Sequence, residues 1–115
     1  MNDNVIEIKR FNFSIRIVNL YRHLTEVKNE SVLSKQLLRS GTSIGANVSE
    51  AECGQSKADF RAKMNIALKE ANETNYWLRL LSKTNYINEK EFESLENDIK
   101  EIIALLTAIC KSTQN

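Results

Sequence analysis

Three glutamates are the carboxylates nearest the expected edges of the core, where acid–base chemistry could take place. Glu50, Glu70 and Glu73 lie in segments with helical spacing, and two carboxylates on neighbouring helices could act as a general acid and a general base. No nucleophile accompanies them, and the only histidine, His23, lies among polar residues. Long helices carry such glutamates in caps, ion pairs and solvated positions. We therefore expect a protein that is not an enzyme and takes no small-molecule substrate.

The histidine and cysteine pattern argues against a metal or redox centre. A di-metal site in a helical bundle uses a Glu-x-x-His pair from each of two helices. Here Leu20 stands three residues before His23. Cys53 and Cys110 are far apart in the sequence and form no CxxC motif. We expect no metal and no cofactor.

Basic side chains offer a second kind of chemistry, which is attraction to phosphate. Residues 1–84 hold 13 Lys and Arg against 9 Asp and Glu, whereas residues 85–115 hold 3 against 6. A ring of identical subunits would repeat any basic patch and strengthen its attraction to RNA or DNA. The candidates for phosphate contact are Arg16, Arg39, Arg61, Lys63 and Arg79. The alternative is a structural or protein-interaction module whose charges only keep it soluble.

Long helices are needed to position these residues. The 115 residues include no proline and three glycines, which favours long uninterrupted helices in a single domain spanning residues 1–115. Apolar residues recur at steps of three and four. They predict an all-α, antiparallel up-down-up-down four-helix bundle, with helices at about residues 5–27, 31–53, 57–83 and 88–111.

The expected ends of these helices carry capping residues. Asn29 or Ser31 could cap the second helix. Capping pairs are also expected at the start of the third and fourth helices, formed by Ser56 with Asp59 and by Asn88 with Glu91. Gly54 suits the position just past the end of the second helix.

Gly41 and Gly45 stand one turn apart inside the second expected helix. Each glycine costs a helix about 1 kcal/mol relative to alanine, so we expect a neighbouring helix to press against the bare backbone. A phosphate-binding loop is the other interpretation of GTSIGAN, but the run lacks both the Walker spacing and GxGxxG. Asn47 belongs to the same helix and is expected to make a structural hydrogen bond.

Two features predict association with other chains. The apolar residues of the first helix cover an arc of roughly 220°, against about 100° for an ordinary surface helix, so this helix is expected to bury more than one side. Ile66, Trp77 and Leu80 lie off the expected core face of the third helix, which suggests a subunit interface. Pairing the second and third helices around their loop places Arg39 near Glu70.

The N-terminus predicts neither export nor membrane insertion. MNDNVIEIKRFNF lacks the apolar core of a signal peptide, and no segment reaches about 18 apolar residues. We expect a cytoplasmic protein with reduced thiols and no contact with a membrane.

The run from Val32 to Leu81 contains two motifs that resemble those of a known protein family. The first is Arg-Ser-x-x-Ser-Ile-x-x-Asn-x-x-Glu, and the second is Ala-x-x-Glu-x-x-Glu-Thr. They are formed by Arg39, Ser40, Ser43, Ile44, Asn47 and Glu50, and by Ala67, Glu70, Glu73 and Thr74. The run resembles the four-helix-bundle proteins encoded by intervening sequences of bacterial 23S rRNA genes, a family of unsettled function, and the likeness covers nearly the whole chain.

This resemblance implies an antiparallel bundle that assembles as a homopentameric ring. It also implies similarity to the accessory protein of diversity-generating retroelements, which binds nucleic acid and a reverse transcriptase through a basic surface. A nucleic acid or a nucleic-acid-handling protein is therefore the expected partner. We expect a structural role for the polar motif residues Ser43, Asn47, Glu50, Glu70 and Glu73.

Overall fold

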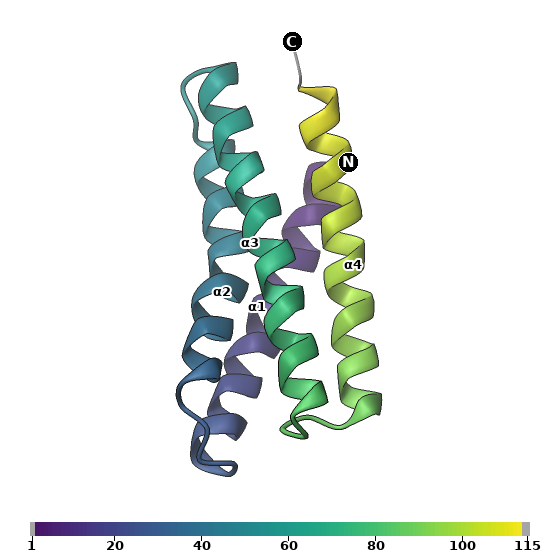
Figure 1. Ribbon diagram of the computed structural model, residues 1–115. Coiled ribbons are helices and arrows are strands. Elements are labelled where there is room, and N and C mark those ends of the chain that lie inside the picture. Colours follow the sequence, from purple (N-terminus) through teal and green to yellow (C-terminus); the bar gives the residue numbers. More distant parts are fainter. Residues whose placement is uncertain (1, 114–115) are drawn as a thin grey trace.

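The computed structural model describes residues 2–113, with side chains from residue 7 onward. This part of the chain forms four helices and no strand. They are α1 (Asn2–Glu26), α2 (Leu33–Glu52), α3 (Lys57–Lys83) and α4 (Glu89–Ser112). The helices run alternately up and down, and the bundle is 45 Å long and 21 Å across (Figure 1). The predicted all-α antiparallel bundle is confirmed.

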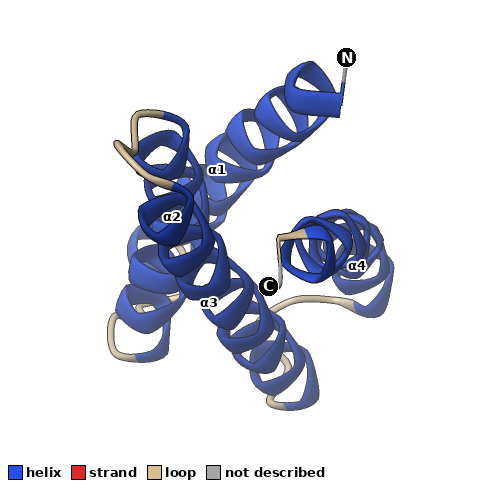
Figure 2. Ribbon diagram, turned by 90° about the horizontal axis from the view of Figure 1, so that it is seen from above, coloured by secondary structure: helices blue, strands red, loops and turns tan. Residues whose placement is uncertain are grey.

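Each helix contacts its neighbours in sequence, and α4 closes the bundle against α1. The α1 helix crosses the others obliquely, so its contact with α4 is the smallest of the four (Figure 2). Within the described residues, no helix is both long and apolar enough to cross a membrane. The core lies along the bundle axis, and its fully buried large side chains are Phe13, Ile17, Leu24, Leu37, Ile44, Leu78, Leu81, Leu95, Ile99, Ile102 and Leu106.

The contact between α1 and α2 is closest at Gly41. A Cβ atom added there would lie 2.8 Å from Cγ2 of the buried Ile17, which is too close for an ordinary contact. The predicted packing of a neighbouring helix on the bare backbone is confirmed at this position. Gly45 differs, because an added Cβ would lie 3.5 Å from the nearest atom, Oγ of Ser14. Its carbonyl oxygen instead accepts a hydrogen bond of 2.8 Å from Nη1 of Arg10.

The start of α2 is capped by Glu30, and neither Asn29 nor Ser31 makes the cap. The Glu30 carboxylate accepts hydrogen bonds from the backbone N–H groups of Val32, Leu33 and Ser34 at 3.1, 2.9 and 2.7 Å. Burial alone would raise the pKa of Glu30, but these hydrogen bonds outweigh it and hold the pKa below its usual value. Asn29 instead has a φ of 57°, a left-handed conformation that asparagine tolerates. The sequence prediction of the α2 cap was therefore wrong.

The caps predicted for the other helices are confirmed. Ser56 Oγ accepts from the Asp59 N–H at 3.0 Å, and Asn88 Oδ1 accepts from the Glu91 N–H at 2.7 Å. Gly54 lies just past the C-cap of α2, where its N–H donates to the Ala51 carbonyl at 3.0 Å.

Replacing Gly41 with alanine tests the close approach of α1. The added methyl must displace Ile17, so we expect the free energy of unfolding to fall by about 1–2 kcal/mol even though alanine favours the helix by about 1 kcal/mol. Gly45→Ala is the matched control and should be neutral or stabilising by up to about 1 kcal/mol. Urea denaturation of both variants measures this, and equal effects would contradict the packing argument.

Replacing Glu30 with alanine tests the α2 cap. We expect a loss of about 1 kcal/mol near neutral pH. Because the folded-state pKa of Glu30 is lowered, its stabilisation is present above the unfolded-state pKa and is lost as the pH falls through the folded-state pKa. The gap in unfolding free energy between wild type and variant should therefore narrow in acid. Glu26→Ala, at an exposed position of α1, is the control, and a gap that widened in acid would contradict the assignment.

Candidate functional site

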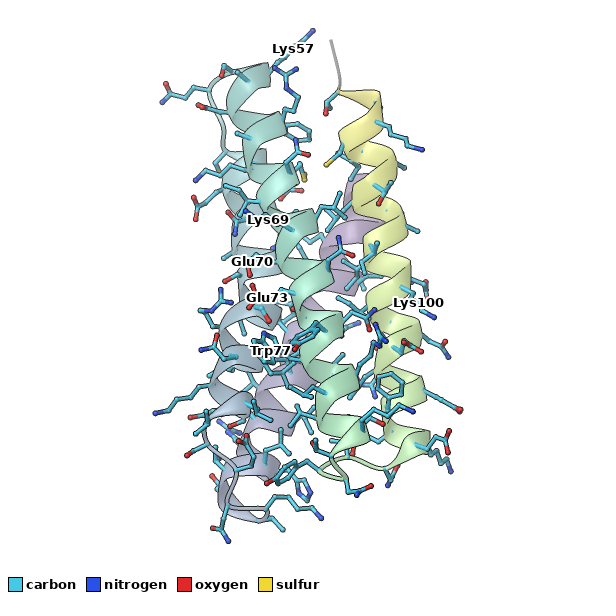
Figure 3. The ribbon with its side chains drawn as sticks, in the orientation of Figure 1. Lys57, Lys69, Glu70, Glu73, Trp77 and Lys100 are labelled. Atoms are coloured by element: carbon cyan, nitrogen blue, oxygen red, sulfur yellow. The ribbon has the colours of Figure 1, made fainter. Side chains whose placement is uncertain are left out.

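A polar network ties α2 to α3 and contains several of the motif residues. The Arg39 guanidinium pairs with Glu70 at 3.2 Å, as the sequence predicted, and with Glu73. Glu73 also accepts a hydrogen bond of 2.9 Å from Nε1 of Trp77. Figure 3 shows Glu70, Glu73 and Trp77 along the side of α3 that lies next to α2.

The pKa values in this network favour ion pairing over acid–base catalysis. The hydrogen bond from Trp77, together with Arg39, holds the pKa of Glu73 below its usual value, although partial burial opposes this. Glu73 in turn raises the pKa of Arg39. A general acid at neutral pH needs a raised carboxyl pKa, so Glu73 is shifted in the wrong direction. Glu50 pairs with Lys63 at 2.9 Å.

The remaining motif residues make contacts within and between helices. The Ser40 and Thr74 hydroxyl oxygens are 2.9 Å apart, and both residues are fully buried between α2 and α3. Ser43 donates to the Arg39 carbonyl at 2.6 Å, and the Asn47 amide donates to the Ser43 carbonyl at 2.8 Å. These residues hold α2 and its contact with α3 in place.

The five candidates for phosphate contact do not form one surface. Arg16 on α1 pairs with Asp98 of α4 at 2.6 Å, and Arg39 and Lys63 have the carboxylate partners described above. Arg61 donates to the Thr113 carbonyl at 2.9 Å. Arg79 is exposed and, within the part of the chain that the structure describes, forms no ion pair. Intramolecular contacts therefore occupy four of the five side chains.

The three interface candidates on α3 differ in their surroundings. Ile66 is 40% exposed and Leu80 is half-buried. Trp77 packs against the hydrophobic core, although its position in the sequence pattern suggested a place away from it.

The outer surface of α1 holds apolar residues that the sequence analysis did not single out. We call Ile8, Phe11 and Ile15 the outer stripe; they are 60%, 65% and 46% exposed. At 100° per residue they lie opposite the buried Phe13 and Ile17. The wide apolar arc of the sequence was the signal for this stripe, but in the single chain the helix buries only one of its apolar sides.

The contact between α1 and α4 is polar and hollowed. Lys9 pairs with Glu101 at 2.6 Å across it, close to a hollow of about 170 Å³. A second hollow of about 360 Å³ lies beside Arg16 and is lined by the exposed His23 and by Glu91. Among the residues that the structure describes, no group of three or more His, Cys, Asp or Glu is placed to hold a metal ion.

These features define a class: an antiparallel four-helix bundle with a hydrophobic core, polar contacts between neighbouring helices and an apolar stripe on the outer face of α1. The sequence model of the family described as "23S rRNA-intervening sequence protein" matches residues 2–108. The chain belongs to this family.

The comparison with solved structures gives a close relative. A crystal structure of a protein of unknown function from the S23 ribosomal protein family of Bacteroides thetaiotaomicron is similar to this chain, with 58% identity and a TM-score of 0.95. The alignment covers 96% of this chain and 99% of that protein. No curated protein matches the sequence. The family is shown, and its molecular role is not established.

The buried hydroxyl pair between α2 and α3 generates a test. Ser40→Ala or Thr74→Val removes the hydrogen bond between the two hydroxyls, while the remaining hydroxyl keeps a backbone carbonyl partner, Glu70 for Thr74 at 2.8 Å and Leu37 for Ser40 at 3.4 Å. Each substitution should therefore lower the free energy of unfolding by about 1 kcal/mol. Removing both should cost less than the two single effects added together, because each single variant already loses the one hydrogen bond that the two hydroxyls share. A double-mutant cycle by urea denaturation measures the coupling. Strict additivity would show that the two hydroxyls act independently.

Proposed function

We propose that this protein is a non-enzymatic, self-assembling bundle in which the outer stripe of α1 packs against another copy of the chain. The exposure of three large apolar side chains along one line of α1 carries this proposal. Contiguous exposed apolar patches of this kind mark interaction sites on soluble proteins.

The energetics support burial of the stripe in an assembly. Burying one large apolar side chain contributes about 1.5–3 kcal/mol, so three of them offset a substantial part of the free-energy cost of association. The family resemblance makes a homopentameric ring the expected assembly, and each subunit would present the same face. We place the assembly in the cytoplasm, in keeping with the free thiols of Cys53 and Cys110.

Nucleic-acid binding is the second candidate function, and a specific surface favours it. We call Lys69, Tyr76, Arg79 and Lys83 the outer face of α3. All four are exposed, and within the described residues none of the three cations forms an ion pair. The nearby carboxylates Glu70 and Glu73 are both paired with Arg39, so they leave these cations uncompensated.

An assembly would repeat this cationic face and strengthen its attraction to RNA or DNA. Of the original five candidates for phosphate contact, only Arg79 belongs to it. A nucleic-acid-handling protein with an acidic surface is an alternative partner for the same face. The rival function is a protein-interaction module that binds no nucleic acid.

Phe11→Glu tests the assembly. The side chain points away from the core, so we expect the variant to keep its helical circular dichroism while its mass in solution falls toward that of one chain. Gln36→Glu adds the same charge at an exposed position of α2 and should leave the mass unchanged.

Trp77→Glu tests whether Trp77 belongs to the core of one chain, against which it packs here, or to a subunit interface. We expect this variant to lose stability as well as any assembly. Light scattering and thermal melting measure the two properties. A wild-type protein that is monomeric at micromolar concentration would contradict the assembly proposal.

A further inference from the structure

We propose that Tyr76 is a stacking platform for one base of a single-stranded nucleic acid, with Arg79 and Lys83 contacting the neighbouring phosphates. The inference rests on the second candidate function and names both the site and the kind of strand that it takes. It requires that this face of α3 stays free in an assembly, which the proposed interface on the outer stripe of α1 allows.

The site is a shallow hollow on the outside of α3. It has a volume of about 200 Å³ and is lined by Tyr76, Arg79, Leu80 and Lys83. Tyr76 is 56% exposed, so much of its side chain is open to solvent. Leu80 is half-buried and supplies an apolar floor next to the ring.

Neighbouring contacts hold the tyrosine ring in place. The rings of Tyr76 and Trp77 meet in an edge-to-face contact, with centroids 5.0 Å apart and planes at 74°. Trp77 is fixed in turn by its hydrogen bond to Glu73, and Glu73 by its pair with Arg39. An edge-to-face contact engages at most one face of the tyrosine ring, so Trp77 leaves at least one face of it uncovered. The network between α2 and α3 therefore orients an exposed aromatic ring in advance of binding.

Arg79 and Lys83 lie at a distance from the Tyr76 ring that suits contact with the phosphates of a nucleic-acid strand. Arg79 and Lys83 follow Tyr76 by three and seven residues, so their Cα atoms lie about 4.5 and 10 Å further along the helix axis. Both are exposed and unpaired within the described residues, as is Lys69 two turns before Tyr76. A stacking ring beside a line of cations is the arrangement with which proteins bind single strands without sequence preference.

The geometry favours a single strand over a duplex. Bases in a duplex are stacked on one another and present only their edges, whereas an unpaired base offers a whole face to an aromatic ring. Tyr76 lines the shallow hollow together with Arg79 and Lys83, so an unpaired base that enters it meets the ring and the cations together. A duplex would contact the cations through its phosphates and make no stacking contact with the Tyr76 ring.

Binding of a labelled oligothymidine of about 12 nucleotides, measured by fluorescence anisotropy at about 50 and 200 mM salt, tests the inference. We expect Tyr76→Phe to bind like the wild type, because the π face remains. Tyr76→Leu should weaken binding by about fivefold or more, the lower end of what one stacked base contributes. Arg79→Gln should weaken binding and flatten its salt dependence, whereas Lys35→Gln, the same charge change at an exposed position of α2, should do neither.

Each contrary outcome has a distinct meaning. Wild-type affinity in Tyr76→Leu would overturn the stacking proposal. The proposal would also be overturned if the protein bound a duplex of the same length with equal affinity, and if this affinity were unchanged in Tyr76→Leu but lost in Arg79→Gln. That outcome would leave nucleic-acid binding in place. An absence of binding to either probe at low salt would overturn both the site and the second candidate function. The mass of every variant is measured as well, and a loss of assembly in Tyr76→Leu would assign the ring to a subunit interface and overturn its role as a base platform.

Discussion

The close approach of Ile17 to the bare backbone at Gly41 is the contact on which the arrangement of α1 depends. A side chain at position 41 would displace Ile17. The two helices can therefore lie this close together only because residue 41 has no side chain. The same approach brings Arg10 within reach of the Gly45 carbonyl. Once α1 is seated on α2, its second apolar side faces away from the core, and this orientation creates the outer stripe.

Polar side chains serve mainly to connect helices in this bundle. Arg39 crosses from α2 to α3, Arg16 and Lys9 cross from α1 to α4, and Arg61 reaches the end of α4. These contacts explain why a count of basic residues overstates the positive charge available to a partner. Among the exposed cations without an ion pair in the described residues, Lys69, Arg79 and Lys83 lie together on the outer face of α3, whereas others, such as Arg22 and Lys35, lie on α1 and α2.

The helices, most of the caps and the close packing at Gly41 could be predicted from the sequence, because each depends on local spacing. The Arg39–Glu70 pair could be predicted as well, because a short loop fixes the relative height of α2 and α3. The cap formed by Glu30 was not predicted, because its side chain accepts hydrogen bonds from backbone N–H groups three and four residues later. The capping patterns used for the sequence do not include this arrangement. The pairing of Arg16 with Asp98 depends on how α1 meets α4, which is set by packing across 82 positions of sequence.

The polar contact between α1 and α4 has a consequence for the order in which the chain folds. The other helix contacts join neighbours in sequence and close through short loops, whereas Lys9 and Glu101 lie 92 positions apart. Bringing such distant segments together carries the largest loop-closure entropy, and this contact is the smallest of the four between helices. During synthesis α1, α2 and α3 can pack before α4 exists, and the docking of α4 against α1 completes the fold last. In the finished protein we expect the contact between α1 and α4, the smallest between two helices, to open more readily than the other helix contacts.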